Sequence, residues 1–109
     1  MTVKEFAEAL GFEVISMPDP DRNVNGAYVG DLLSWVMGKA ASGNVWITIM
    51  SNINIVAVAT LADISCIVLA EGVMPDGDAL ETASKKGVNI LKSPLSSYEI
   101  AKNVSGILS

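Results

Sequence analysis

The sequence predicts a three-layer α/β/α fold around a mostly parallel or mixed sheet of about five strands. Two apolar runs, residues 45–50 and 64–69, are rich in β-branched side chains and have the composition of strands that are buried on both faces. Segments of helical length separate these runs from other strand-like segments. Strands that alternate with helices are joined by right-handed crossovers, and we therefore expect most of them to lie parallel.

The chain is predicted to begin with a helix and a strand. Thr2 and Glu5 have the spacing of a capping box, in which the hydroxyl and the carboxylate each bond to the other residue's backbone. The short helix that follows is expected to stop at Gly11, because glycine readily adopts the left-handed conformation of a C-terminal cap. Residues 12–17 then alternate like a strand, and the proline- and aspartate-rich residues 18–21 form a turn.

A second strand is predicted over residues 24–29, with an interruption at Gly26. Asp31 follows it and has a side chain suited to a helix N-cap. The helix after Asp31 is expected to bury one apolar face against the sheet. That face consists of Leu32, Leu33, Val36 and Met37.

The second half of the chain repeats a strand-then-helix order. After the strand at residues 45–50, Asn52 or Asn54 is predicted to cap a helix over residues 55–61. The remaining predicted elements are a strand at residues 64–69, a helix at 78–86 closed by Gly87, a strand at 88–91, and a helix at 96–108 that begins with the capping-box pattern of Ser96 and Glu99.

Length and composition exclude several classes of protein. The 109 residues suit one domain, and we expect residues 1–109 to form a single unit. Half of the residues are hydrophobic and 17% are charged, which disfavours intrinsic disorder. The net charge of −5 and the scattered seven Lys and Arg disfavour nucleic acid and anionic membranes as partners. Polar residues interrupt the apolar stretch 45–70, so a spanning helix is not expected and a cytoplasmic location is predicted.

The residues needed for common catalytic chemistry are missing from the sequence. There is no histidine, which removes Ser-His and Cys-His catalysis and most zinc sites. The one cysteine, Cys66, lies in an apolar run and is expected to be a buried small hydrophobe. No phosphate-binding loop or dinucleotide fingerprint is present. We therefore predict that the chain is not an enzyme and that it needs neither a cofactor nor a metal.

Polar residues and glycines follow the predicted strands, at the positions where open α/β sheets bind ligands. Hydroxyls, amides and helix N-termini suit an anionic or phosphorylated small molecule. The alternative is that these residues only cap helices. The candidate ligand-binding residues are Gly30, Asp31, Ser51, Asn52, Asn54, Gly72, Ser93 and Ser96.

Three aromatic side chains are expected to fill the core, because aromatic side chains bury large areas. They are Tyr28, Trp35 and Trp46. For Trp35, a contact between two copies of the chain is the alternative.

Several segments together resemble the DRTGG domain family over nearly the whole chain. They are residues 21–28, 30–34, 46–48, 54–59 and 87–91. The resemblance implies a fold similar to the N-terminal domain of bacterial HPr kinase/phosphorylase. It also implies a regulatory or dimerising role rather than kinase activity. The chain departs from the family pattern at residues 50–52, where Met-Ser-Asn stands in place of Gln, Thr and His.

The resulting hypothesis is a homodimeric, non-catalytic regulatory module. It is expected to sense a small anionic metabolite, similar to a nucleotide or phosphate, or to dock a partner protein. Two alternatives remain open. One is an accessory subunit or an HPr-kinase-related enzyme component, and the other is a purely structural dimerisation domain.

Overall fold

A five-stranded mixed sheet forms the centre of the molecule in the computed structural model, which describes residues 1–108. The strand order is β1-β5-β4-β3-β2. Strands β2 to β5 are parallel, and β1 pairs antiparallel with β5 at one edge. This confirms the predicted fold class. The strands are β1 (Glu13–Ser16), β2 (Ala27–Val29), β3 (Val45–Thr48), β4 (Cys66–Leu69) and β5 (Ile90–Lys92).

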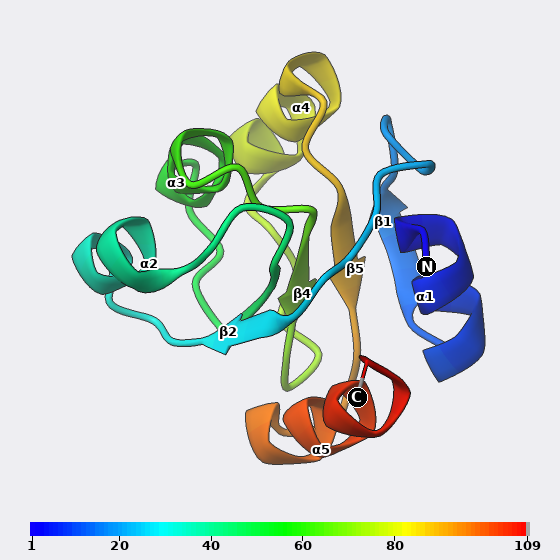
Figure 1. The fold of residues 1–109 in the computed structure, drawn as a ribbon. Helices are drawn as coiled ribbons and strands as arrows, with labels where there is room; N and C mark the ends of the chain where they lie inside the picture. Colours follow the sequence, from blue (N-terminus) through cyan, green and yellow to red (C-terminus); the bar gives the residue numbers. More distant parts are fainter. Residues whose placement is uncertain (109) are drawn as a thin grey trace.

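Helices cover both faces of this sheet, which gives three layers (Figure 1). The crossover helices α2, α3 and α4 lie side by side on one face, and α1 and α5 cover the other. The helices are α1 (Val3–Leu10), α2 (Leu33–Lys39), α3 (Asn54–Leu61), α4 (Gly77–Lys86) and α5 (Ser97–Leu108). None of them combines the length and the apolar character that crossing a bilayer requires, within the part of the chain that the structure describes.

The two central strands explain why the sequence shows apolar runs there. Every residue of β3 and β4 is buried, because alternate side chains enter opposite helix layers. Val45 and Ile47 pack towards α1 and α5, whereas Trp46 packs towards α2, α3 and α4. Trp46 is completely buried, as expected for a core aromatic residue.

The predicted cap of α3 is wrong, because Ile53 is its N-cap residue and neither Asn52 nor Asn54 caps it with a side chain. The capping box and the glycine caps are confirmed. The Thr2 hydroxyl accepts from Glu5 N–H at 3.1 Å, and the Glu5 carboxylate accepts from Thr2 N–H at 2.8 Å. Gly11 and Gly87 end α1 and α4 in the left-handed conformation, with φ of 69° and 75°.

The predicted helix at residue 31 is partly wrong. Leu32, not Asp31, is the N-cap residue of α2, and no side chain caps this helix. Val36 is buried and Leu33 is partly buried against the sheet, but Leu32 and Met37 are about half exposed. Trp35 is 56% exposed, so its predicted place in the core is also wrong. A helix of seven residues has room for only a narrow buried stripe.

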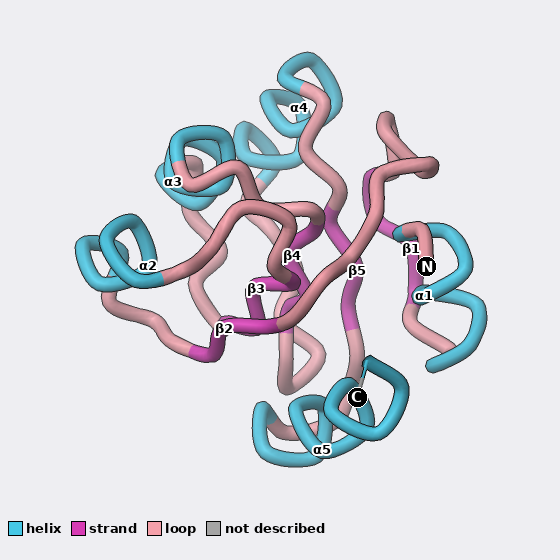
Figure 2. The backbone as a smooth tube through the Cα atoms, viewed as in Figure 1, coloured by secondary structure: helices cyan, strands magenta, loops and turns pink. Residues whose placement is uncertain are grey.

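The second predicted strand is shorter than expected. It begins after Gly26, and residues 17–26 form a long connection that joins opposite edges of the sheet (Figure 2). This connection follows the amino edge of the parallel strands. There, Val24 N–H donates to Met1 C=O at 2.9 Å, and Asn25 N–H donates to Gly43 C=O at 3.1 Å. These bonds hold the connection against α1 and against the start of β3.

Candidate functional site

The predicted ligand-binding residues lie along the carboxyl edge of the parallel strands. Gly30 and Asp31 follow β2, Ser51 and Asn52 follow β3, and Asn54 begins α3. Gly72 follows β4, and Ser93 and Ser96 follow β5. The topology therefore gathers these residues at one edge of the sheet, which is what the alternation of strands and helices implies.

Several of these polar groups bond to neighbouring parts of the same edge. The Asp31 carboxylate accepts from the Thr48 hydroxyl at 2.7 Å and from Ile49 N–H at 3.0 Å, so it joins the end of β2 to the end of β3. The Asn52 amide oxygen accepts from Asn54 N–H at 2.9 Å. The side chains of Asp31 and Asn52 therefore stabilise the ends of the strands through hydrogen bonds within the chain.

The serines after β5 also bond locally. Ser93 is 4% exposed, and its hydroxyl accepts from Leu95 N–H at 3.1 Å. Its carbonyl accepts from Gly72 N–H at 2.9 Å. The Ser96 hydroxyl accepts from Glu99 N–H at 3.2 Å and so caps α5. A ligand at this edge would have to use the remaining groups, and the strand-end site stays a prediction.

Asn54 differs from the others because it lines a hollow. This groove of about 400 Å³ lies between α3 and α4, and its floor is apolar. The polar side chains along it are Asn54, Thr60, Thr82 and Lys86.

A larger hollow, of about 610 Å³, lies between β1 and α4. Its origin is topological. The helices α2, α3 and α4 connect the four parallel strands, so their layer ends at α4, while the sheet continues by one antiparallel strand, β1. The face of β1 beside α4 therefore has no helix of its own. The hollow falls within the size range of small-molecule sites, roughly 300–1,000 Å³.

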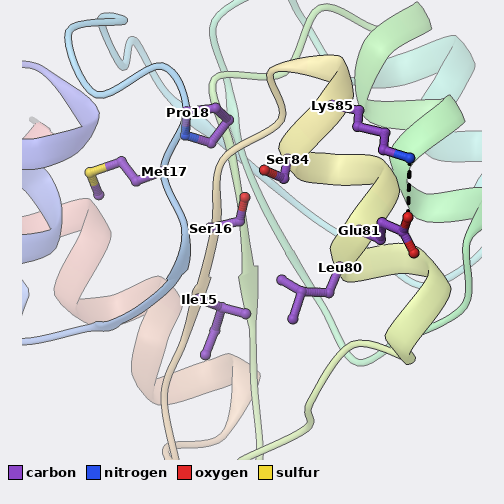
Figure 3. A pocket seen from close by; sticks show the side chains of 8 residues that line it. All are labelled: Ile15, Ser16, Met17, Pro18, Leu80, Glu81, Ser84 and Lys85. Carbon is purple, nitrogen blue, oxygen red and sulfur yellow. Dashed lines mark hydrogen bonds and ion pairs between the residues drawn. The ribbon is translucent and has the colours of Figure 1, made fainter.

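The lining of this hollow combines an apolar base with polar walls (Figure 3). Ile15 from β1 and Leu80 from α4 point into it from opposite sides. Ser84 and Lys85 lie along the α4 wall, and the Lys85 ammonium group contacts the Glu81 carboxylate at 3.0 Å. Met17 and Pro18 lie at the end of β1, and the hydroxyl of Ser16 donates to Val88 C=O at 3.4 Å.

Among the residues that the structure describes, neither a cysteine nor a metal-ligand cluster lines this hollow. Cys66 is completely buried in β4, and burial raises the pKa of its thiol, so a thiolate nucleophile is strongly disfavoured. Within residues 1–108, no three side chains of His, Cys, Asp and Glu come together as metal ligands would.

No pattern in the sequence predicts this hollow. Its two walls are about 65 positions apart in the chain, and they meet only because β1 pairs antiparallel with β5. Neither the alternation in β1 nor the caps of α4 reveal that pairing.

The comparison with known families decides the classification. The model of the DRTGG domain matches residues 5–107. This chain belongs to the DRTGG domain family. The match covers the whole sheet and reaches into the first and last helices, α1 and α5. No match was found among curated proteins.

One solved structure with the same fold is the regulatory region of Clostridium perfringens pyrophosphatase. That structure contains CBS and DRTGG domains complexed with the activator diadenosine tetraphosphate. The TM-score is 0.71 at 15% sequence identity, and the match covers 93% of this DRTGG chain. It covers 44% of the pyrophosphatase chain, so the likeness shows a shared fold with part of that protein.

Proposed function

We propose that this DRTGG domain is a non-catalytic regulatory module that acts as a homodimer and binds a small anionic ligand in the hollow between β1 and α4. The hollow carries the proposal. It combines an apolar base at Ile15 and Leu80 with a hydroxyl at Ser84, and Lys85 lies at its rim with its ammonium group turned away from Ile15 towards Glu81 (Figure 3). A planar or apolar body fits the base, while phosphate or carboxylate oxygens suit the ammonium group and the hydroxyl.

Local charge supports an anionic ligand although the chain as a whole carries −5. The last turn of α4 contains the adjacent cations Lys85 and Lys86. Glu81 is the acidic side chain paired with Lys85 along this wall. An anion at Lys85 would compete with Glu81, so ligand binding would exchange one ion pair for another.

A regulatory role is supported by the family and by the fold neighbour. In the pyrophosphatase, the DRTGG domain belongs to a regulatory region that was crystallised with a nucleotide activator. The chain here has no histidine and a buried cysteine, which favours binding over catalysis.

The test is a thermal-shift and calorimetric titration of the full chain. The panel would contain diadenosine tetraphosphate, ATP, AMP and inorganic phosphate. A ligand that binds only the native state at about 100 Kd adds ~2.7 kcal/mol to stability, which is readily visible as a higher Tm. Lys85→Met and Ser84→Trp are expected to weaken binding at least tenfold, the second by filling an exposed wall of the hollow.

Lys102→Met is the matched control, because Lys102 is an exposed lysine on α5, on the other face of the sheet. It is expected to bind like the parent. Equal binding by Lys85→Met, Ser84→Trp and the parent would rule out this hollow. Loss of binding in Asn54→Ala and Ser93→Ala instead would favour the strand-end site. No shift with any member of the panel would contradict the ligand class.

A further inference from the structure

The edge strand β2 is short, at three residues, but it lacks the other features that usually protect a sheet edge from pairing with another chain. Residues 23–30, which contain β2, include no charged residue and no proline. Natural edge strands are commonly blunted by lysine, proline, bulges or a covering segment. The absence of these devices leaves a neutral backbone edge.

The opposite edge of the same sheet is protected. In β1, the pairing with β5 is irregular between Val14 and Ser16. Glu13 forms an ion pair with Lys92 at 3.7 Å, and Pro18 lies two residues beyond the end of the strand. The β1 edge thus has an irregularity, charged side chains and a nearby proline that discourage pairing with another chain, and the β2 edge has none of these three.

The backbone of β2 has polar groups available for a further strand. The Gly26 carbonyl accepts from Val45 N–H at 2.8 Å, and Gly30 N–H donates to the Ile47 carbonyl at 3.2 Å. Both groups therefore face β3. Because alternate residues of a strand point their polar groups to opposite sides, Ala27 and Val29 direct theirs away from β3.

Apolar surface borders this edge on both faces of the sheet. On the α2 side, Leu32 is 57% exposed and Trp35 is 56% exposed. Val29 on the strand itself is 48% exposed. On the α5 side, a hollow of about 300 Å³ is lined in part by Ala27 and Leu108. An apolar band therefore runs from α2 across β2 to α5.

We propose that this band binds a second copy of the chain, with β2 pairing antiparallel to β2 of the partner across a twofold axis. The inference rests on the proposed homodimer and gives it a surface. An edge that offers N–H and C=O groups at Ala27 and Val29 is complementary to itself when reversed, which a twofold interface requires. The two sheets would join into one continuous sheet, with the Trp35 side chains beside the junction.

The size of the band suits a reversible dimer. Weak and transient interfaces bury less than about 1,200 Å² in total, and a short edge strand with its flanking side chains suits that class. Only three residues of each chain belong to β2. We therefore expect association that depends on concentration in the micromolar range rather than a permanent dimer.

The test is sedimentation velocity over a series of concentrations, with variants at matched positions. Val29→Lys places a charge on the β2 edge, and Val14→Lys places the same charge on the β1 edge, where Val14 is 50% exposed. The parent and Val14→Lys are expected to approach twice the chain mass of 11.4 kDa at high concentration. Val29→Lys is expected to weaken association at least tenfold, and so is Trp35→Glu, whose exposed helical position leaves the strand intact.

The possible results test dimer formation and the proposed surface separately. A parent that stays monomeric up to about 1 mM would overturn both the dimer and its surface, without touching the ligand titration. A dimer that survives Val29→Lys and Trp35→Glu would overturn the surface alone. Hydrogen exchange gives an independent readout, because the amides of Ala27 and Val29 should become protected as the concentration rises. Unchanged exchange in a dimeric sample would also contradict strand pairing.

Discussion

Asn89 binds the backbone of Asp19 in both directions. Its amide oxygen accepts from Asp19 N–H at 3.0 Å, and its amide nitrogen donates to Asp19 C=O at 2.8 Å. The same nitrogen also donates to Ser65 C=O at 3.0 Å. Asn89 is 1% exposed. The buried Asn89 side chain therefore forms hydrogen bonds to the backbone in the way that a neighbouring strand would. These bonds hold the connection between β1 and β2 against the amino edge of the sheet.

Replacing Asn89 is expected to loosen this connection. In Asn89→Ala, the backbone N–H and C=O of Asp19 and the buried C=O of Ser65 lose their hydrogen-bond partner. A buried polar group without a partner lowers the free energy of unfolding. We expect the free energy of unfolding to fall by about 2–3 kcal/mol in urea titrations. Asn103→Ala, at an exposed position of α5, is the control and should show no loss. A loss in Asn89→Ala below about 0.5 kcal/mol, which is typical of surface changes, would contradict this role.

Asp31 is expected to act through Thr48 rather than as a helix cap. Thr48 is completely buried, and its hydroxyl donates to the Asp31 carboxylate. Asp31→Ala should lower stability by about 1–2 kcal/mol, because the buried hydroxyl loses its acceptor. A double-mutant cycle with Thr48→Val measures the coupling, which should exceed ~0.5 kcal/mol for groups in contact. Additive effects of the two changes would instead mean that the bond is energetically unimportant.

Acid should weaken the contact between Asp63 and the β1–β2 connection. Hydrogen bonds from the Ser42 hydroxyl and then from Arg22 lower the pKa of the Asp63 carboxyl. The Arg22 guanidinium lies 2.7 Å from this carboxylate. Since the folded-state pKa is below the unfolded value of about 3.9, the stabilisation is complete above that value and is lost as the pH falls through the folded pKa.

The measurement for Asp63 is the unfolding free energy of the parent and of Asp63→Asn between pH 7 and pH 2. The parent should be the more stable at pH 7, and the difference should shrink below about pH 4. The effect is expected to be modest because the pair is exposed and screened by water. Asp21→Asn is the control, since the Asp21 side chain forms no ion pair among the described residues. A difference that does not change with pH would contradict the charge-based account.

Truncation to alanine should lower the stability of the monomer at Leu33 but hardly at Trp35. Leu33→Ala removes a partly buried side chain from the contact between α2 and the sheet, and a loss of about 1–3 kcal/mol is expected, less than for a fully buried leucine. Trp35 is exposed and has the Lys39 ammonium group 4.0 Å from its ring centre. Trp35→Ala should therefore change monomer stability by less than about 1 kcal/mol. Urea unfolding at low protein concentration checks both, and a large loss in Trp35→Ala would place this tryptophan in the core after all.

Local chemistry was enough to predict much of the fold. The reciprocal bonds of Thr2 and Glu5 and the left-handed Gly11 and Gly87 depend on residues a few positions apart, so their spacing in the sequence carries the information. The apolar strands β3 and β4 were also predictable, since only a sheet covered on both faces buries every residue of a strand. The order of strands and helices then implied that the strand-end residues share one edge.

Tertiary structure decided what those polar residues contact and where a hollow forms. Asp31 has the side chain of a helix cap, yet it bonds to Thr48 because the end of β3 lies beside it in the folded sheet. Asn89 and Asp19 are 70 positions apart and meet only across the amino edge. The hollow between β1 and α4 exists because an antiparallel strand extends the sheet beyond its helix layer. Such contacts depend on which strands become neighbours, and the free energy that selects neighbours comes from burial in the whole molecule rather than from any local pattern.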